Sequence, residues 1–161
     1  MSTTTKSKLS ITTPSELEIV LTREFDAPRE LVWLAYTTPE HIKRWWGCNQ
    51  STLTTCEVDL REGGAWRNVL SIGEGQEWGF HGVYREIQQP ERLVYTQIFE
   101  PMPQHPSLVT VTFTAHDGKT TLQEVILHES VEARDGHLGS GMEVGVTQSF
   151  DKLDEVLATL A

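Results

Sequence analysis

The chain has little cysteine, little basic charge and no long hydrophobic run. Its two cysteines, Cys48 and Cys56, are spaced like no metal or redox motif, so we expect free thiols. The chain has 13 Lys and Arg residues and 23 Asp and Glu residues. The resulting net charge of −10 argues against nucleic acid and anionic membranes as partners. No apolar run approaches the ~20 residues of a membrane span, and the N-terminus lacks an apolar signal-peptide core. These absences predict a cytoplasmic protein.

Motifs for several kinds of chemistry are also missing. The six histidines show neither His-x-x-x-His nor His-x-His spacing. The sequence contains no Gly-x-Ser-x-Gly elbow, phosphate loop or dinucleotide fingerprint. We therefore expect no metal and no cofactor, and we favour binding over catalysis.

The clearest positive signal is an amphipathic helix over residues 139–160. Its apolar positions recur at steps of three and four residues, at Met142, Val146, Phe150, Leu153, Leu157 and Leu160. Ser140 and Glu143 predict a capping box at its start. A second stripe consists of the small residues Gly141, Gly145 and Ser149. This stripe predicts either an open space beneath the helix or close packing of the helix on a sheet.

Most of the remaining chain has the pattern of β-structure. Residues 1–14 are rich in Ser and Thr and are predicted to be a disordered tail, which leaves residues 15–161 as one domain. A strand over 17–25 precedes two short helices, one beginning at Pro28 and one capped by Thr38. Six strands follow, over 53–60, 65–72, 77–87, 92–100, 109–115 and 120–131. Short turns join them into an antiparallel meander, so the fold class is α+β.

One hairpin places a carboxylate in an unusual position. Asp117-Gly118 is the signal of a two-residue turn, which pairs Val111 with Glu124. That register directs Glu124 to an apolar face, whereas one extra loop residue would direct it to solvent. A carboxylate on an apolar face must find a partner or become neutral. Arg67 is either that partner or a surface residue.

The candidate site residues are mainly aromatic. The five tryptophans either pack the core or line a pocket for an apolar or planar ligand. His81 is either a structural hydrogen-bonding group or an acid–base group, and Tyr84 is expected on the outer face of its strand. Gly79 and Gly82, within the same strand, indicate a bulge, a bend or a close approach. The predicted ligand-binding residues are Trp45, Trp66, Trp78, His81, Phe99, Glu124, Met142, Gly145 and Val146.

A series of short motifs, in order, resembles a known family. The motifs are Phe25-Asp26-Ala27-Pro28, Trp45-Trp46, Asp59-Leu60-Arg61-Glu62-Gly63-Gly64, Gly82-Val83-Tyr84-Arg85-Glu86-Ile87, Pro90-Glu91-Arg92-Leu93-Val94 and Gly141-Met142. They resemble the helix-grip fold of the START and pollen-allergen superfamily (SRPBCC). More narrowly, they resemble the family named after the C-terminal domain of the heat-shock-protein ATPase activator. The resemblance covers residues 17–160 and implies the order β-α-α-β6-α, with a curved antiparallel sheet wrapped around a long C-terminal helix.

The resemblance also implies candidate functions. Members of the superfamily bind sterols, lipids, hormones or polyketides between sheet and helix, and a few are cyclases or aromatases. The leading expectation is therefore a protein that binds a small hydrophobic or aromatic molecule in that space, as a monomer or homodimer. One alternative is a modulator of a chaperone ATPase. This alternative is weakened because the eponymous co-chaperone has a further N-terminal domain, for which we expect no room in this chain. The other is a polyketide cyclase-like or hydratase-like enzyme that uses His81 or Glu124.

Overall fold

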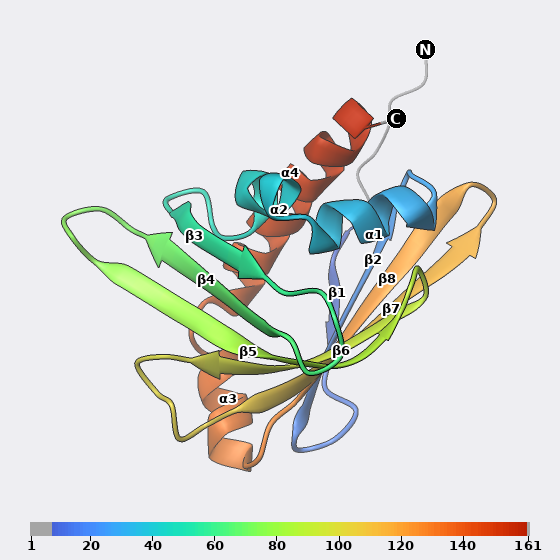
Figure 1. The fold of residues 1–161 in the computed structure, drawn as a ribbon. Helices are drawn as coiled ribbons and strands as arrows, with labels where there is room; N and C mark the ends of the chain where they lie inside the picture. Colours follow the sequence, from blue (N-terminus) through green and yellow to red (C-terminus); the bar gives the residue numbers. More distant parts are fainter. Residues whose placement is uncertain (1–7, 161) are drawn as a thin grey trace.

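A curved antiparallel sheet with helices on its concave side forms the protein (Figure 1). The structure is a computed structural model that describes residues 8–160. In chain order its elements are β1 (Ser10–Thr12), β2 (Glu18–Phe25), α1 (Arg29–Thr37), α2 (Pro39–Trp45), β3 (Thr52–Val58), β4 (Ala65–Ser71), β5 (Glu77–Gln88), β6 (Arg92–Phe99), β7 (Ser107–His116), β8 (Lys119–Leu127), α3 (Val131–Leu138) and α4 (Met142–Leu160). The predicted α+β helix-grip class is confirmed.

The strand order across the sheet is β1-β2-β8-β7-β6-β5-β4-β3. Strands β3 to β8 follow one another as the expected meander, and β2 pairs with β8. Residues 10–12, expected in a disordered tail, instead form β1 against β2. The reason is that Ile11 lies opposite Leu21 and packs against the core. Residues 1–7 of the predicted tail lie outside the described residues.

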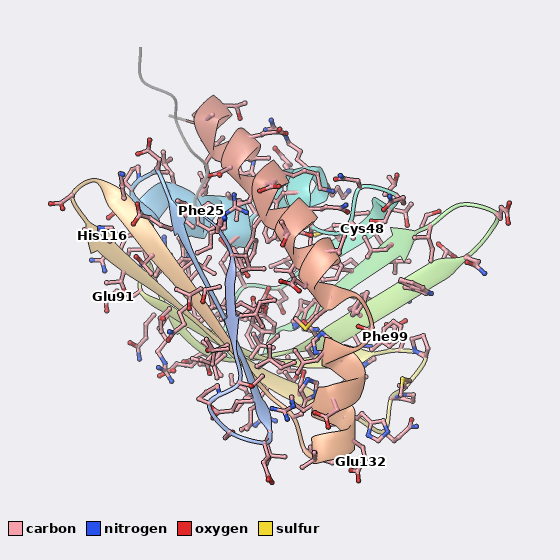
Figure 2. All side chains as sticks on the ribbon, turned by 180° about the vertical axis from the view of Figure 1, so that it is seen from behind. Phe25, Cys48, Glu91, Phe99, His116 and Glu132 are labelled. Carbon is pink, nitrogen blue, oxygen red and sulfur yellow. The ribbon has the colours of Figure 1, made fainter. Side chains whose placement is uncertain are left out.

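The helices pack against one another as well as against the sheet. The first short helix begins one residue after Pro28, which occupies the N-cap position, and α2 has Pro39 in its first turn as predicted. The long helix α4 contacts both α1 and α2. It crosses the open side of the sheet (Figure 2) and buries one face. The buried residues of that face are Met142, Phe150, Leu153, Val156 and Leu157.

Residues 131–138, between β8 and the long helix, form a separate helix, α3, which the sequence analysis did not predict. The hydroxyl of Ser130 caps it by accepting a hydrogen bond from the Ala133 N–H at 3.1 Å. The predicted capping box at Ser140 is not formed, because its hydroxyl donates to the His137 carbonyl at 2.6 Å and α4 begins at Met142.

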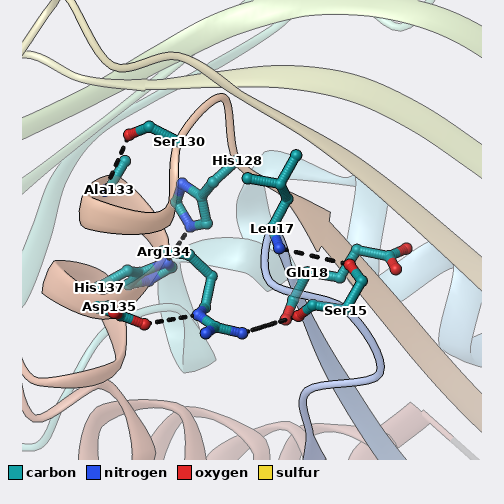
Figure 3. A network of polar contacts seen from close by, with 9 residues as sticks. All are labelled: Ser15, Leu17, Glu18, His128, Ser130, Ala133, Arg134, Asp135 and His137. Carbon is teal, nitrogen blue, oxygen red and sulfur yellow. Dashed lines mark hydrogen bonds and ion pairs between the residues drawn. The ribbon is translucent and has the colours of Figure 1, made fainter.

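Polar contacts hold α3 against the start of β2 (Figure 3). Arg134 donates to the Ser15 carbonyl at 2.8 Å and pairs with Asp135. Nε2 of His128 and Nδ1 of His137 lie 3.0 Å apart.

Among residues 8–160, no helix is long and apolar enough to cross a membrane. Both cysteines are free thiols, as predicted.

Candidate functional site

A cavity lies between the two short helices and the inner face of β3 to β6. Its lining residues are Tyr36, Ile42, Trp45, Trp46, Val58, Trp66, Asn68, Tyr84, Leu93, Tyr95 and Gln97. The space free of protein atoms is about 420 Å³ with the open mouth included, and about 40 Å³ of it is available to the centres of water-sized molecules. Since a water molecule needs roughly 10–15 Å³ on that measure, the cavity has room for about three.

The sheet wall of the cavity is built around Trp66. This residue pairs with Gly82 on β5, where a Cβ would lie 1.7 Å from the Thr96 carbonyl oxygen and 2.7 Å from Trp66 Nε1. The absence of a side chain lets the indole N–H reach the Thr96 carbonyl at 3.1 Å. The close approach predicted at Gly82 is therefore confirmed, and it fixes the orientation of one wall.

The helical wall is built around Trp45. Its indole N–H donates to the Ala35 carbonyl at 2.9 Å, and its ring lies 5.0 Å from that of Tyr36. Trp45 and Trp66 are 2% and 6% exposed. Both predicted tryptophans are thus core residues and cavity walls at the same time.

A carboxylate between two tyrosines lies on the same inner face. The predicted register is confirmed, because Val111 pairs with Glu124. The Tyr36 hydroxyl donates to Glu124 Oε1 at 2.6 Å, and Tyr95 also hydrogen-bonds to this carboxylate. Burial raises the pKa of Glu124, and the two tyrosine hydrogen bonds oppose that rise. Burial and the charge of Glu124 raise the pKa of both tyrosines well above the ordinary value, so they remain donors.

Asn68 on β4 brings a further polar group to the cavity. The residue is 5% exposed and lines the space. Its side-chain oxygen Oδ1 is buried and has no hydrogen-bond partner among the described residues. Buried polar atoms are rarely left unpaired, so this oxygen calls for an explanation.

His81 lies on the other face of the sheet from Glu124. It pairs with Arg67 across the β4–β5 ladder, and both side chains bind Glu100. The hydrogen bond from Arg67, with a smaller contribution from His81, lowers the pKa of Glu100 to about 2. An enzyme in which His81 and Glu124 converge is therefore excluded, and Arg67 is not the partner of Glu124. Within residues 8–160, no three His, Cys, Asp or Glu side chains form a group that could hold a metal ion.

Trp78 and Phe99 lie on the inner face, but outside the residues that line the cavity. Phe99 stacks on Phe80 with ring centroids 5.0 Å apart. The Trp78 ring contacts the Phe99 ring edge-on, with centroids 6.2 Å apart. Phe80 in turn contacts Trp46 at 5.1 Å. These rings form an aromatic row, which we define as Trp46, Phe80, Phe99 and Trp78. The row extends from the cavity to the 43%-exposed indole of Trp78.

The predicted site residues on α4 do not line this cavity. Met142 belongs to the core cluster, Val146 packs against it, and a Cβ on Gly145 would meet nothing within 4 Å. The hydroxyl of Ser149 accepts from the Gly47 N–H at 2.9 Å and donates to its carbonyl at 2.8 Å. At Ser149 the small stripe thus serves close packing. The cavity lies under α1 and α2 rather than under α4.

Several lining residues were missed or misplaced by sequence reasoning. Tyr84 was expected on the outer face, yet it is 6% exposed and lines the cavity. The close approach at Gly82 is the signal that could have placed it, because residues two apart in a strand share a face. Asn68 was detectable in the same way, two residues after Trp66. Gln97 was detectable likewise, because it lies two residues before the predicted site residue Phe99.

The fold and the cavity define a helix-grip protein with an aromatic-lined internal space. The model of the family described as "Activator of Hsp90 ATPase homolog 1-like protein" matches residues 26–158, and the chain belongs to this family.

Solved structures share the fold over nearly the whole chain. A crystal structure of a protein from Rhodobacter sphaeroides is 26% identical, with a TM-score of 0.89 over 94% of this chain and 99% of that one. A protein from Nitrosomonas europaea is 25% identical, with a TM-score of 0.83 over 92% and 98%. An AHSA1-like protein from Aeromonas hydrophila is 21% identical, covers 88% and 93%, and has a TM-score of 0.63, which shows the fold alone. No curated protein sequence matches the chain.

Proposed function

We propose that the protein binds a small apolar or aromatic molecule in the cavity between α1–α2 and β3–β6. The observation that carries the proposal is the lining itself: tryptophan and tyrosine walls with a few polar groups, which is the usual composition of a small-molecule site. The helix-grip superfamily that the sequence resembles supports the same function. Free thiols fit the cytoplasm as the place where it acts.

The test compares two variants on neighbouring residues of β6. Gln97→Phe puts a ring into the cavity, whereas Ile98→Phe puts the same ring on the other face, where residue 98 pairs with His81. A panel of small aromatic compounds is screened by thermal shift and calorimetry. A compound at 100 times its Kd raises Tm by roughly 5–10 °C for a domain of this size.

The proposal expects at least one compound to bind the wild type and Ile98→Phe but not Gln97→Phe. It fails if no compound binds the wild type, or if Gln97→Phe binds as the wild type does.

The family match supports a second candidate, modulation of a chaperone ATPase. Its support is the description of the family model rather than any surface of this chain. The ATPase rate of an Hsp90-type chaperone is measured with and without saturating protein. An unchanged rate rejects this candidate and leaves the ligand-binding proposal untouched.

A further inference from the structure

The unpartnered oxygen of Asn68 defines what kind of group the cavity accepts. Oδ1 is an acceptor, and four of the donors that border the cavity are already engaged by other groups. The indole N–H groups of Trp45 and Trp66 bind the backbone carbonyls of Ala35 and Thr96. The hydroxyls of Tyr36 and Tyr95 are directed at Glu124 instead. A donor on the ligand is therefore the natural partner of this buried acceptor.

The lining also restricts the charge of the ligand. The described residues that line the cavity include no Asp, Glu, His, Lys or Arg. An ionised carboxylate, phosphate or ammonium group would lose its hydration there without a counter-ion. A neutral ligand is therefore favoured. A hydroxyl is a small neutral group that can both donate to Asn68 and accept from the Gln97 amide or the Tyr84 hydroxyl, which border the same space.

The cavity is too small to hold the whole ligand. About 40 Å³ accommodates a hydroxyl and the atoms next to it. A larger apolar body must lie outside the enclosed part, and the aromatic row begins there with Trp46. Phe80 and Phe99 already stack on each other in this row, and an aromatic cluster of this kind favours an aromatic partner.

We propose that this cavity binds a neutral aromatic alcohol, with its hydroxyl donating to Asn68 Oδ1 and its ring against the aromatic row. The inference rests on the proposed function and specifies its ligand class.

Two probes that differ in one donor test it. 2-Naphthol and 2-methoxynaphthalene share the ring system and the oxygen, but only the first can donate. Their affinities are measured by calorimetry on the wild type and on Asn68→Leu, which keeps the side-chain volume and removes the acceptor. We expect the wild type to bind 2-naphthol at least about tenfold more tightly and Asn68→Leu to bind both probes equally, since the preference comes from one buried acceptor. In the wild type, the side-chain amide signals of Asn68 should also shift in NMR spectra when 2-naphthol is added.

The outcomes separate this inference from the proposed function. Equal affinity of the wild type for both probes, or a preference that persists in Asn68→Leu, overturns the donor assignment and leaves ligand binding intact. Absence of binding of either probe to the wild type overturns the assignment of an aromatic alcohol, and the panel of compounds then decides the proposed function. If Asn68→Leu does not fold, the wild-type preference and the Asn68 signals decide alone, and a preference without a shift of those signals overturns the inference.

Discussion

The Tyr36 hydroxyl lies 2.6 Å from Glu124 Oε1 and joins α1 to β8 beside the cavity. Tyr36 also forms part of the cavity wall, so the same contact anchors the helix that covers the space. The carboxylate is held on an apolar face because tyrosines replace the hydration it loses.

Tyr36→Phe should lower the free energy of unfolding by about 1–3 kcal/mol at pH 7, because it removes a donor from a buried acceptor. The pKa of Glu124 is already raised in the folded state, and losing this donor raises it further. A group with a raised folded-state pKa contributes stability at low pH that is lost as pH rises through that pKa. The deficit should therefore be larger at pH 7 than at pH 5 in denaturant titrations.

Tyr84→Phe is the matched control, because Tyr84 borders the same cavity, whereas the hydrogen bonds that act on the pKa of Glu124 come from Tyr36 and Tyr95. Equal deficits in the two variants, independent of pH, would contradict the role of the Tyr36–Glu124 contact.

Gly82→Ala should destabilise the protein by about 2 kcal/mol or more and displace Trp66. Its Cβ would lie 1.7 Å from a backbone oxygen, and backbone cannot move aside cheaply. Gly145→Ala provides the comparison: it lies inside α4 with nothing within 4 Å of the added carbon, so it should stabilise by about 0.5–1 kcal/mol. Thermal unfolding followed by tryptophan fluorescence measures both. A loss of stability in Gly145→Ala as large as that in Gly82→Ala would refute the packing described here.

Arg23→Met should cost about 1.5–3 kcal/mol. Arg23 is 2% exposed and pairs with Asp151 and Asp154 of α4, each at 2.9 Å, so its removal takes away two charge-assisted contacts between β2 and α4. Arg67→Met breaks an exposed pair and should cost much less, because solvent screens that pair. Chemical denaturation of the two variants compares these costs, and similar values would show that the buried pair does not hold α4 in place.

Stability should fall on acidification through the histidine pair at α3. Burial, with the nearby His128, lowers the pKa of His137 to about 4, and burial with Arg134 and His105 lowers that of His128. Below pH 6.5 the unfolded chain binds protons that the folded chain does not, so stability declines as pH falls toward 4. His137→Gln should reduce this decline by about 1 kcal/mol per pH unit, measured by urea titrations between pH 6.5 and 4.5. An unchanged slope would contradict the assignment.

Much of the fold follows from local rules. The Asp117-Gly118 turn set the register of β7 and β8, and with it the position of Glu124, because two-residue turns allow little choice. The helix α3 was missed because its sequence has a weak apolar pattern and its stability depends on Ser130 and Arg134, which make contacts outside any periodic signal.

The candidate site was predicted only in part. Trp45 and Trp66 were found because indoles are conspicuous. Both short helices were predicted as well, but α4 was expected to cover the cavity because it was the longer and more regular helix. Which helix closes a cavity depends on packing between distant segments, such as the Ser149–Gly47 contact. Likewise, Asn68 became notable only once its burial and its unpaired oxygen were known.

We propose that the ligand binds in the space beneath α1 and α2. Intermolecular NOEs between bound 2-naphthol and the labelled protein report its position. We expect NOEs from the ring protons of the probe to the side chains of Trp46 and Trp66. NOEs confined to outer-face residues such as His81 and Val83, or to the exposed side of α4 at Val144, would contradict it.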